Sequence, residues 1–197
     1  MFDWSDNDCY PLLVDVLRGD GVVLAASDTV LGLFAQLSEK AKNRLDSIKK
    51  RNLKPYIILI KSASLLRDFT DQSIDDSMQQ IIDRHWPGPL TIIFKAKATL
   101  PHWMVSSQKT IAIRIPDHEG LQKLLQHFDA LFTTSANISD QPLPDRYADV
   151  NPEILNQVQA VCCQADKIYD GPASTIVDFS SGSINIVRLG AVGVDSI

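Results

Sequence analysis

The residues best suited to chemistry in this chain are cations and small polar groups. Arg114 ends the apolar run "IAIR", and a buried guanidinium needs a polar or anionic partner. Thr133, Ser135 and Asn137 lie at the end of another apolar run, "LFTTSAN", where polar groups either meet a ligand or form an ordinary turn or cap. Arginine gives bidentate contacts to phosphate and carboxylate groups, which suits a site for anionic substrates.

Other candidates stand where further predicted strands and helices end. Lys49 and Arg51 close a predicted helix, where cations either bind an anion or simply complement the helix dipole. The remaining candidates on or beside predicted strands are Ser27, Asp28, Thr29, Ser174, Thr175 and Arg188. Open α/β sheets bind ligands where their strands end, so we predict that these groups can hold a triphosphate and a carboxylate together.

Common catalytic and nucleotide-binding motifs are missing from the sequence. It has no GxxxxGK[ST] phosphate loop, no GxGxxG turn, no HExxH zinc motif and no GxSxG elbow, so a nucleotide must be held by side chains. The four histidines lack ligand spacing, and no carboxylate cluster indicates a permanent metal site. The cysteines Cys9, Cys162 and Cys163 fit neither a disulfide framework nor a metal motif, so we predict buried thiols.

Composition predicts one folded domain over residues 1–197. The chain is 45% hydrophobic, which is enough to form a core. Its formal net charge of −5 gives no global attraction to nucleic acid, so any RNA contact must be weak or local. The N-terminus is acidic, and no apolar run approaches the roughly 20 residues that span a bilayer. We therefore predict a cytoplasmic protein with no membrane association.

Strand-like and helix-like runs alternate along the chain, which predicts a single α/β domain. The predicted strands are 21–27, 56–60, 90–94, 110–115, a strand from 131, one near Val161, and a closing pair, 174–179 and 183–189, around Ser181 and Gly182. The predicted helices are one ending before Gly19 with Leu12, Leu13, Val16 and Leu17 on one face, one from Ser38 to Arg51, one capped by Ser73, one capped by Asp117, and a short one after Pro152.

Seven stretches, taken together, resemble the YrdC/Sua5 family of threonylcarbamoyl-AMP synthases. They are "SDTVLGL" at 27–33, Lys-x-Arg at 49–51, "WPGPLT" at 86–91, "IAIRIPDH" at 111–118, "TSANIS" at 134–139, "STIVD" at 174–178 and "VRLGAV" at 187–192. They occur in the family's order and cover nearly the whole chain. The chain ends where the family's catalytic domain would, so it resembles the short, TsaC-type form without the C-terminal Sua5 domain.

The resemblance implies a fold and a reaction. The fold would be a twisted open mixed sheet flanked by helices, with a large concave cavity. The enzyme would be a nucleotidyltransferase that joins L-threonine, bicarbonate and ATP, with Mg²⁺ accompanying the ATP, into threonylcarbamoyl-AMP and pyrophosphate. A downstream threonylcarbamoyl transferase complex would use the product to make the t6A modification at position 37 of tRNA.

The resemblance also implies roles for individual residues. The catalytic tetrad would be Lys49, Arg51, Ser135 and Asn137. The threonine side would comprise Thr29, Arg114, Thr133 and Ser174, and the ATP side would comprise Thr91 and Arg188 together with Lys49, Arg51 and Ser135.

The chain departs from the family pattern at four positions while keeping the tetrad. Ala26, Asn52 and Ala173 stand where proline is common, and Leu31 replaces a usual tyrosine. The intact tetrad favours an active synthase. The alternatives are an RNA-binding module of this fold, a paralogue without synthase activity, and a carbamoyl-adenylate enzyme similar to the YrdC-like domain of hydrogenase maturation proteins.

Overall fold

The computed structural model describes residues 1–50 and 55–197. Its strands are β1 (Val23–Ala25), β2 (Gly32–Gln36), β3 (Ile57–Ile60), β4 (Leu90–Lys95), β5 (Thr110–Arg114), β6 (Ala130–Ser135), β7 (Ala160–Cys162), β8 (Thr175–Asp178) and β9 (Asn185–Arg188). Its helices are α1 (Cys9–Arg18), α2 (Glu39–Lys49), α3 (Leu66–Phe69), α4 (Asp76–His85), α5 (Glu119–Leu124) and α6 (Pro152–Leu155). No helix in this part of the chain is long and apolar enough to cross a lipid bilayer.

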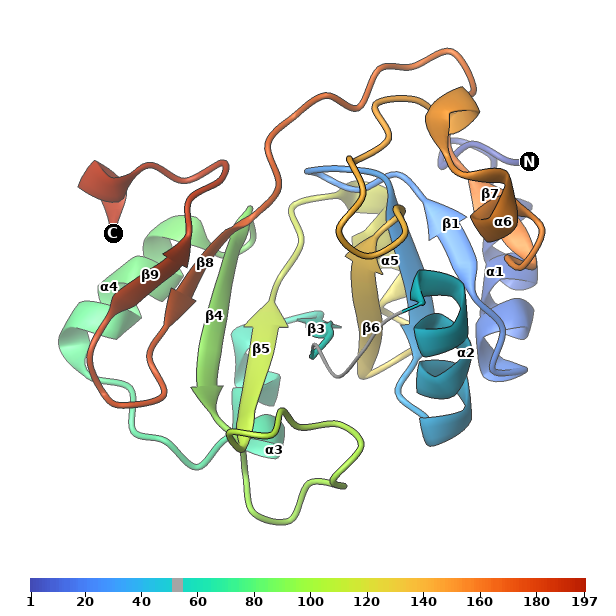
Figure 1. Cartoon of the computed structure of the whole chain (residues 1–197). Coiled ribbons are helices and arrows are strands. Elements are labelled where there is room, and N and C mark those ends of the chain that lie inside the picture. The colour runs from blue at the N-terminus through green and yellow to red at the C-terminus, as the bar shows by residue number, and fades with distance from the viewer. Residues whose placement is uncertain (51–54) are drawn as a thin grey trace.

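The strands form one mixed sheet in the order β7-β1-β2-β6-β3-β5-β4-β8-β9 (Figure 1). The pairs β1–β7, β3–β5 and β4–β8 are parallel, and the other neighbours are antiparallel. Strand β6 lies near the centre, between β2 and β3, which places its polar end among several other strands. The predicted fold class, a twisted open α/β sheet flanked by helices, is confirmed.

Strand residues alternate between two hydrophobic clusters, one on each face of the sheet. Ile58 and Phe132 pack in the cluster that contains buried residues of α2, α4 and α6, whereas their neighbours Leu59 and Leu131 pack in the cluster with α1 and α5. This alternation is what a strand buried on both faces requires. Helices α1 and α5 cover only part of the second face, and the uncovered part forms the floor of a cavity.

Helix α2 follows its sequence signals closely. Ser38 caps the helix, since its hydroxyl accepts a hydrogen bond from the backbone N–H of Ala41. Ala41, Leu45 and Ile48 recur at helical spacing and are all buried. The helix ends at Lys49, which brings that side chain to the cavity.

Two predicted helix caps are wrong. Asp75 rather than Ser73 caps α4, where its carboxylate accepts from the Met78 N–H at 2.8 Å. His118 rather than Asp117 caps α5, where its Nδ1 accepts from the Leu121 N–H at 3.3 Å. In both regions several neighbouring residues are capable of capping, so the sequence alone does not single out the cap.

Other predicted elements differ in extent. Strand β1 has three residues and is shorter than the predicted strand 21–27. Strand β2 was not predicted, because no turn signal separates it from the stretch "SDTVLGL" in which it begins. Leu13 and Leu17 of α1 are buried as predicted, but Leu12 is exposed. The closing pair is confirmed as the β8–β9 hairpin, whose turn contains Gly182 with a φ of 85°.

The cap of α5 predicts a pH dependence of stability. Burial lowers the pKa of His118 from its ordinary 6.5, and the charge of Asp28 opposes this shift. The other charged groups near the ring are Lys167, Asp117 and Glu119, and the Trp4 ring lies 5.6 Å from it. In the unfolded chain His118 therefore takes up a proton near pH 6.5, whereas in the folded chain it does so only at a lower pH. The free energy of unfolding keeps its full value above pH 6.5 and declines as the pH falls towards the folded pKa.

We expect the melting temperature to fall between roughly pH 7 and pH 5, in part because of His118. His118→Asn keeps a capping side chain without a titratable ring, so it should flatten this decline. Thermal denaturation followed by circular dichroism across that range measures the difference. Identical slopes in the two proteins would contradict the assignment.

Candidate active site

A cavity of about 660 Å³ opens over the uncovered face of the sheet. Its walls come from the β1–β2 loop, the end of α2, the end of β6 with the loop that follows, and the β8–β9 hairpin with the segment before it. Its floor includes Ile57, Ala112 and Ile93 from β3, β5 and β4. Segments that lie far apart in the sequence therefore meet around one space, as expected where strands of an α/β sheet end.

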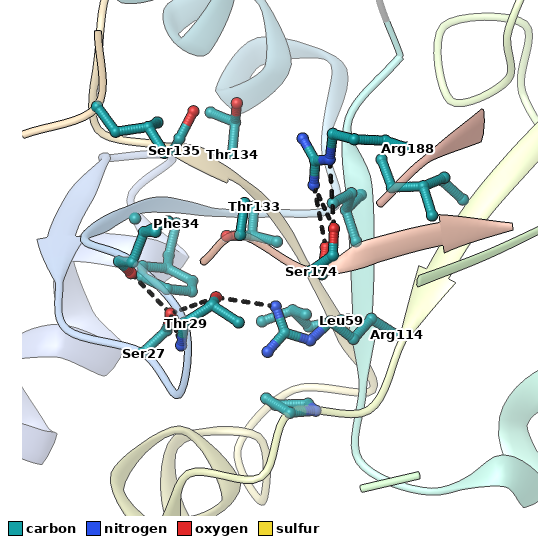
Figure 2. A pocket seen from close by; sticks show the side chains of 18 of the residues that line it. Ser27, Thr29, Phe34, Leu59, Arg114, Thr133, Thr134, Ser135, Ser174 and Arg188 are labelled. Atoms are coloured by element: carbon teal, nitrogen blue, oxygen red, sulfur yellow. Dashed lines mark hydrogen bonds between the residues drawn. The ribbon is translucent and has the colours of Figure 1, made fainter. Parts of the chain in front are cut away.

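Polar side chains gather in two regions of this cavity (Figure 2). Ser135 and Thr134 lie on one side, and Thr29 and Arg114 lie on the other, with Thr133 between them. Strand alternation alone places Thr134 on the opposite face from Thr133, but Thr134 also lines the cavity.

Lys49 holds together the turn that follows β6. Its ammonium donates to the carbonyl of Ser135 at 2.6 Å, to the side-chain oxygen of Asn137 at 2.9 Å, and to the carbonyl of Asn137. Only 2% of Lys49 is exposed, and an ammonium has three donors. The Ser135 hydroxyl donates to the same Asn137 side-chain oxygen at 2.6 Å. Three members of the predicted tetrad are thus in direct contact, and the fourth, Arg51, lies outside the described residues.

Arg114 anchors the other region. Its Nε donates to the carbonyl of Gly88 at 3.0 Å, its Nη1 donates to the hydroxyl of Thr29 at 3.1 Å, and its Nη2 forms an ion pair with Asp28 at 2.5 Å. Burial lowers the pKa of Arg114, and the Asp28 carboxylate opposes this shift. The partner that a buried arginine requires is therefore Asp28, and the "WPGP" loop orients the guanidinium through Gly88.

Ser174 and Arg188 line the same cavity and contact each other. Arg188 Nη2 donates to the carbonyl of Ser174 at 2.7 Å, and the Ser174 hydroxyl lies 2.9 Å from that of Thr91. Burial, followed by the charge of Arg114, lowers the pKa of Arg188, so the two guanidinium groups affect each other. Thr91 has no exposed surface and does not line the cavity. Thr91 can therefore act on the predicted ATP side only indirectly, through its hydrogen bond to Ser174.

A close backbone contact fixes the segment that carries Ser174. The buried Thr175 hydroxyl accepts from the backbone N–H groups of Gly190 and Val192, both at 2.9 Å, and donates to the carbonyl of Val192 at 2.7 Å. A side-chain carbon added at Gly190 would lie 2.0 Å from the carbonyl oxygen of Ala173. Only glycine permits this approach, which holds the segment after β9 against the segment that leads into β8.

Most of the predicted site residues meet in the one cavity. Those that line it are Thr29, Lys49, Arg114, Thr133, Ser135, Asn137, Ser174 and Arg188. The sequence prediction grouped Asp28 with possible ligands of anionic substrates, whereas its carboxylate pairs with Arg114. The expectation that Arg114 needs a partner was the signal for this pairing. Among the departures from the family pattern, Ala26 and Leu31 are buried in the core, Ala173 lines the cavity, and Asn52 lies outside the described residues.

The cysteines are buried free thiols, as predicted. Burial raises the pKa of Cys163 to about 11 and that of Cys162 further still. Thiols with such high pKa values are protonated at neutral pH and are poor nucleophiles.

Comparisons with known proteins identify relatives of this chain. The sequence model of the Sua5/YciO/YrdC family, described as "Telomere recombination", matches residues 15–190. A Methanocaldococcus jannaschii protein, provisionally named a threonylcarbamoyl-AMP synthase, is 32% identical over 93% of this chain and 86% of its own length. An Escherichia coli O6:H1 protein named threonylcarbamoyl-AMP synthase is 33% identical over 73% of this chain and 77% of its own length.

A solved structure is similar over nearly the whole chain. It is Pyrococcus abyssi Sua5 complexed with L-threonine, with a TM-score of 0.87 and 26% sequence identity. The similarity covers 96% of this chain but only 56% of the Sua5 chain, so this chain spans little more than half of that protein. Since the family model extends over most of the sequence and the fold agrees with it, the chain belongs to the Sua5/YciO/YrdC family.

Proposed function

We propose that this protein is an L-threonylcarbamoyladenylate synthase. It joins L-threonine, bicarbonate and ATP into threonylcarbamoyl-AMP and releases pyrophosphate. Relatives named for this activity and the threonine complex of Sua5 support the proposal. The observation that carries it is a single cavity with an Arg114–Thr29 region on one side and a Lys49–Ser135–Asn137 cluster on the other.

The chemistry proceeds in two steps. The amine of threonine and bicarbonate form a carbamate with loss of water, and a carbamate oxygen then attacks the α-phosphorus of ATP. The bond from this phosphorus to the bridging oxygen breaks, and pyrophosphate leaves with the electron pair. Two anions must approach each other in this reaction, so the main tasks of the protein are positioning and charge stabilisation.

The two regions of the cavity suit these two substrates. Arg114, Thr29 and Thr133 offer a guanidinium and two hydroxyls to the carboxylate and polar groups of threonine. Arg188 and Ser135 offer a cation and a hydroxyl to the phosphates, and Arg51 stays a predicted phosphate ligand. Lys49 acts mainly through Ser135 and Asn137, because its three donors are already used within the protein.

Further parts of the proposal concern what accompanies and follows the reaction. Mg²⁺ would enter with the phosphates of ATP and neutralise part of their charge. No group of three or more histidine, cysteine or carboxylate side chains in residues 1–50 and 55–197 is arranged to hold a metal ion. The product would pass to a threonylcarbamoyl transferase complex for t6A synthesis on tRNA.

The direct test is product formation. The protein is incubated with ATP, Mg²⁺, L-threonine and ¹³C-bicarbonate, and threonylcarbamoyl-AMP is sought by mass spectrometry. We expect the labelled carbon in the product and an equal amount of pyrophosphate, both dependent on threonine. ATP consumption without this adduct would exclude the synthase and favour a paralogue with other chemistry.

Ser135→Ala separates catalysis from stability. The variant loses the hydrogen bond to Asn137, but Lys49 still holds the Asn137 side-chain oxygen. We expect a free energy of unfolding within about 1 kcal/mol of wild type. Threonine-dependent pyrophosphate release should fall by about tenfold or more, since a group that orients the phosphates is lost. Full activity with a lowered melting temperature would mean that Ser135 serves only the turn.

A further inference from the structure

Asp28 is a buried carboxylate to which the reaction assigns no role. It follows β1, and only 9% of its side chain is exposed. One carboxylate oxygen pairs with Arg114 Nη2 at 2.5 Å and accepts from the backbone N–H of Asp117 at 3.0 Å. The other oxygen is buried without a hydrogen-bond partner in the part of the chain that the structure describes. A buried carboxylate that is incompletely satisfied is costly, so its presence calls for a reason.

The charge balance of the cavity supplies that reason. Arg114 and Arg188 both line the cavity, and burial together with the charge of Arg114 lowers the pKa of Arg188. Without the charge of Asp28, Arg114 would be a strong site for phosphate. A guanidinium can form two parallel hydrogen bonds with a phosphate group as well as with a carboxylate. Asp28 forms an ion pair with Arg114, so its charge acts directly on that guanidinium.

We propose that Asp28 neutralises Arg114 and so reserves this region of the cavity for threonine, a zwitterion, while keeping polyanions out of it. This inference rests on the proposed function, since it assumes that threonine lies beside Arg114. Asp28 makes Arg114 part of a neutral pair that can still donate hydrogen bonds to one carboxylate. A pyrophosphate group, with several negative charges, meets the nearby carboxylate of Asp28 and is repelled.

Asp28→Asn tests this proposal, because the variant should gain affinity for pyrophosphate beside Arg114. The substitution removes the negative charge with almost no change in shape. Threonine is titrated into each protein by calorimetry, with and without saturating inorganic pyrophosphate. In the wild type, pyrophosphate should leave the apparent Kd of threonine unchanged. In Asp28→Asn, pyrophosphate should compete and raise this Kd by about tenfold or more, a change that a general loss of stability does not produce.

Asp117→Asn is the matched control. It makes the same chemical change at an exposed neighbouring residue, and it should behave as the wild type. The double variant Asp28→Asn/Arg114→Gln removes both charges of the pair, and its binding of pyrophosphate is titrated directly because Arg114 also serves threonine. The affinity for pyrophosphate that Asp28→Asn gains should be absent from the double variant. An affinity as high as that of Asp28→Asn would overturn the proposal, because the gain would not depend on Arg114.

The remaining outcomes are also decisive. One is that pyrophosphate fails to compete with threonine in folded Asp28→Asn, and another is that it competes equally in the wild type. Either result would show that Asp28 does not determine which ligand binds beside Arg114. If the wild type binds no threonine, the proposed function fails instead. Should Asp28→Asn not fold, Asp28→Ser leaves room for an anion beside Arg114. Its melting temperature should then rise on adding inorganic phosphate more than that of the wild type, and an equal rise would overturn the proposal.

Discussion

Lys49→Met is expected to reduce threonylcarbamoyl-AMP synthesis by at least about 100-fold and to lower the free energy of unfolding by about 3 kcal/mol. Methionine has a similar length, but it cannot replace the three hydrogen bonds to Ser135 and Asn137. The turn after β6 would then lose the group that fixes both of its functional side chains. Initial rates of pyrophosphate release and urea denaturation measure the two effects.

Lys50→Met provides the control for this prediction. Lys50 is the next residue, and it pairs with Glu153 at 2.6 Å in a largely exposed ion pair. Exposed ion pairs contribute little, so both activity and stability should stay close to wild type, within about 0.5 kcal/mol. A Lys49→Met variant as active as Lys50→Met would show that the turn keeps its geometry without the ammonium.

Gly190→Ala is expected to lower both stability and activity although it lies outside the cavity lining. The added methyl group would lie 2.0 Å from the carbonyl oxygen of Ala173 and 2.8 Å from that of Ser174. These are backbone atoms, so the two segments must separate, at a cost of about 1–3 kcal/mol. Separation would also shift Ser174 and the guanidinium of Arg188 that donates to it. We therefore expect a raised KM for ATP as well as a lower melting temperature.

Gly193→Ala is the matched substitution. No atom lies within 4 Å of a side-chain carbon added there, and its φ of −74° suits any residue. Its stability should equal or slightly exceed that of the wild type, because alanine restricts the unfolded chain. Equal losses in the two variants would mean that flexibility of the C-terminal segment, rather than the close contact at Gly190, explains the effect.

Helical and strand periodicity predicted most elements of this fold, because long periodic segments determine which face is buried. Ala41, Leu45 and Ile48 specify α2 in this way. Short strands such as β2 and the choice of capping residue were not predictable, because they depend on partners far away in sequence. His118 caps α5 in a region where the neighbouring Asp117 N–H is already bonded to Asp28.

The site was predicted less from spacing than from the family resemblance. Spacing alone left Lys49 and Ser135 as either site residues or ordinary helix and strand ends. It could not reveal that the three Lys49 donors are used within the protein, nor that Thr91 is buried and hydrogen-bonded to Ser174. Such facts depend on which side chains the sheet order brings together. Arg114 was the exception, since an arginine inside an apolar run requires a partner wherever it lies.

The central position of β6 also determines when this protein can fold during translation. Strand β6 begins at residue 130, yet it pairs with β2 and β3, which the ribosome makes much earlier. Until β6 emerges, both earlier strands expose apolar side chains and unpaired backbone groups that can recruit other chains. Arg188 emerges last of all the cavity residues. A nascent chain therefore completes its binding site only after residue 188 has been made, and a chain that stops before residue 130 lacks the strand with which β2 and β3 pair.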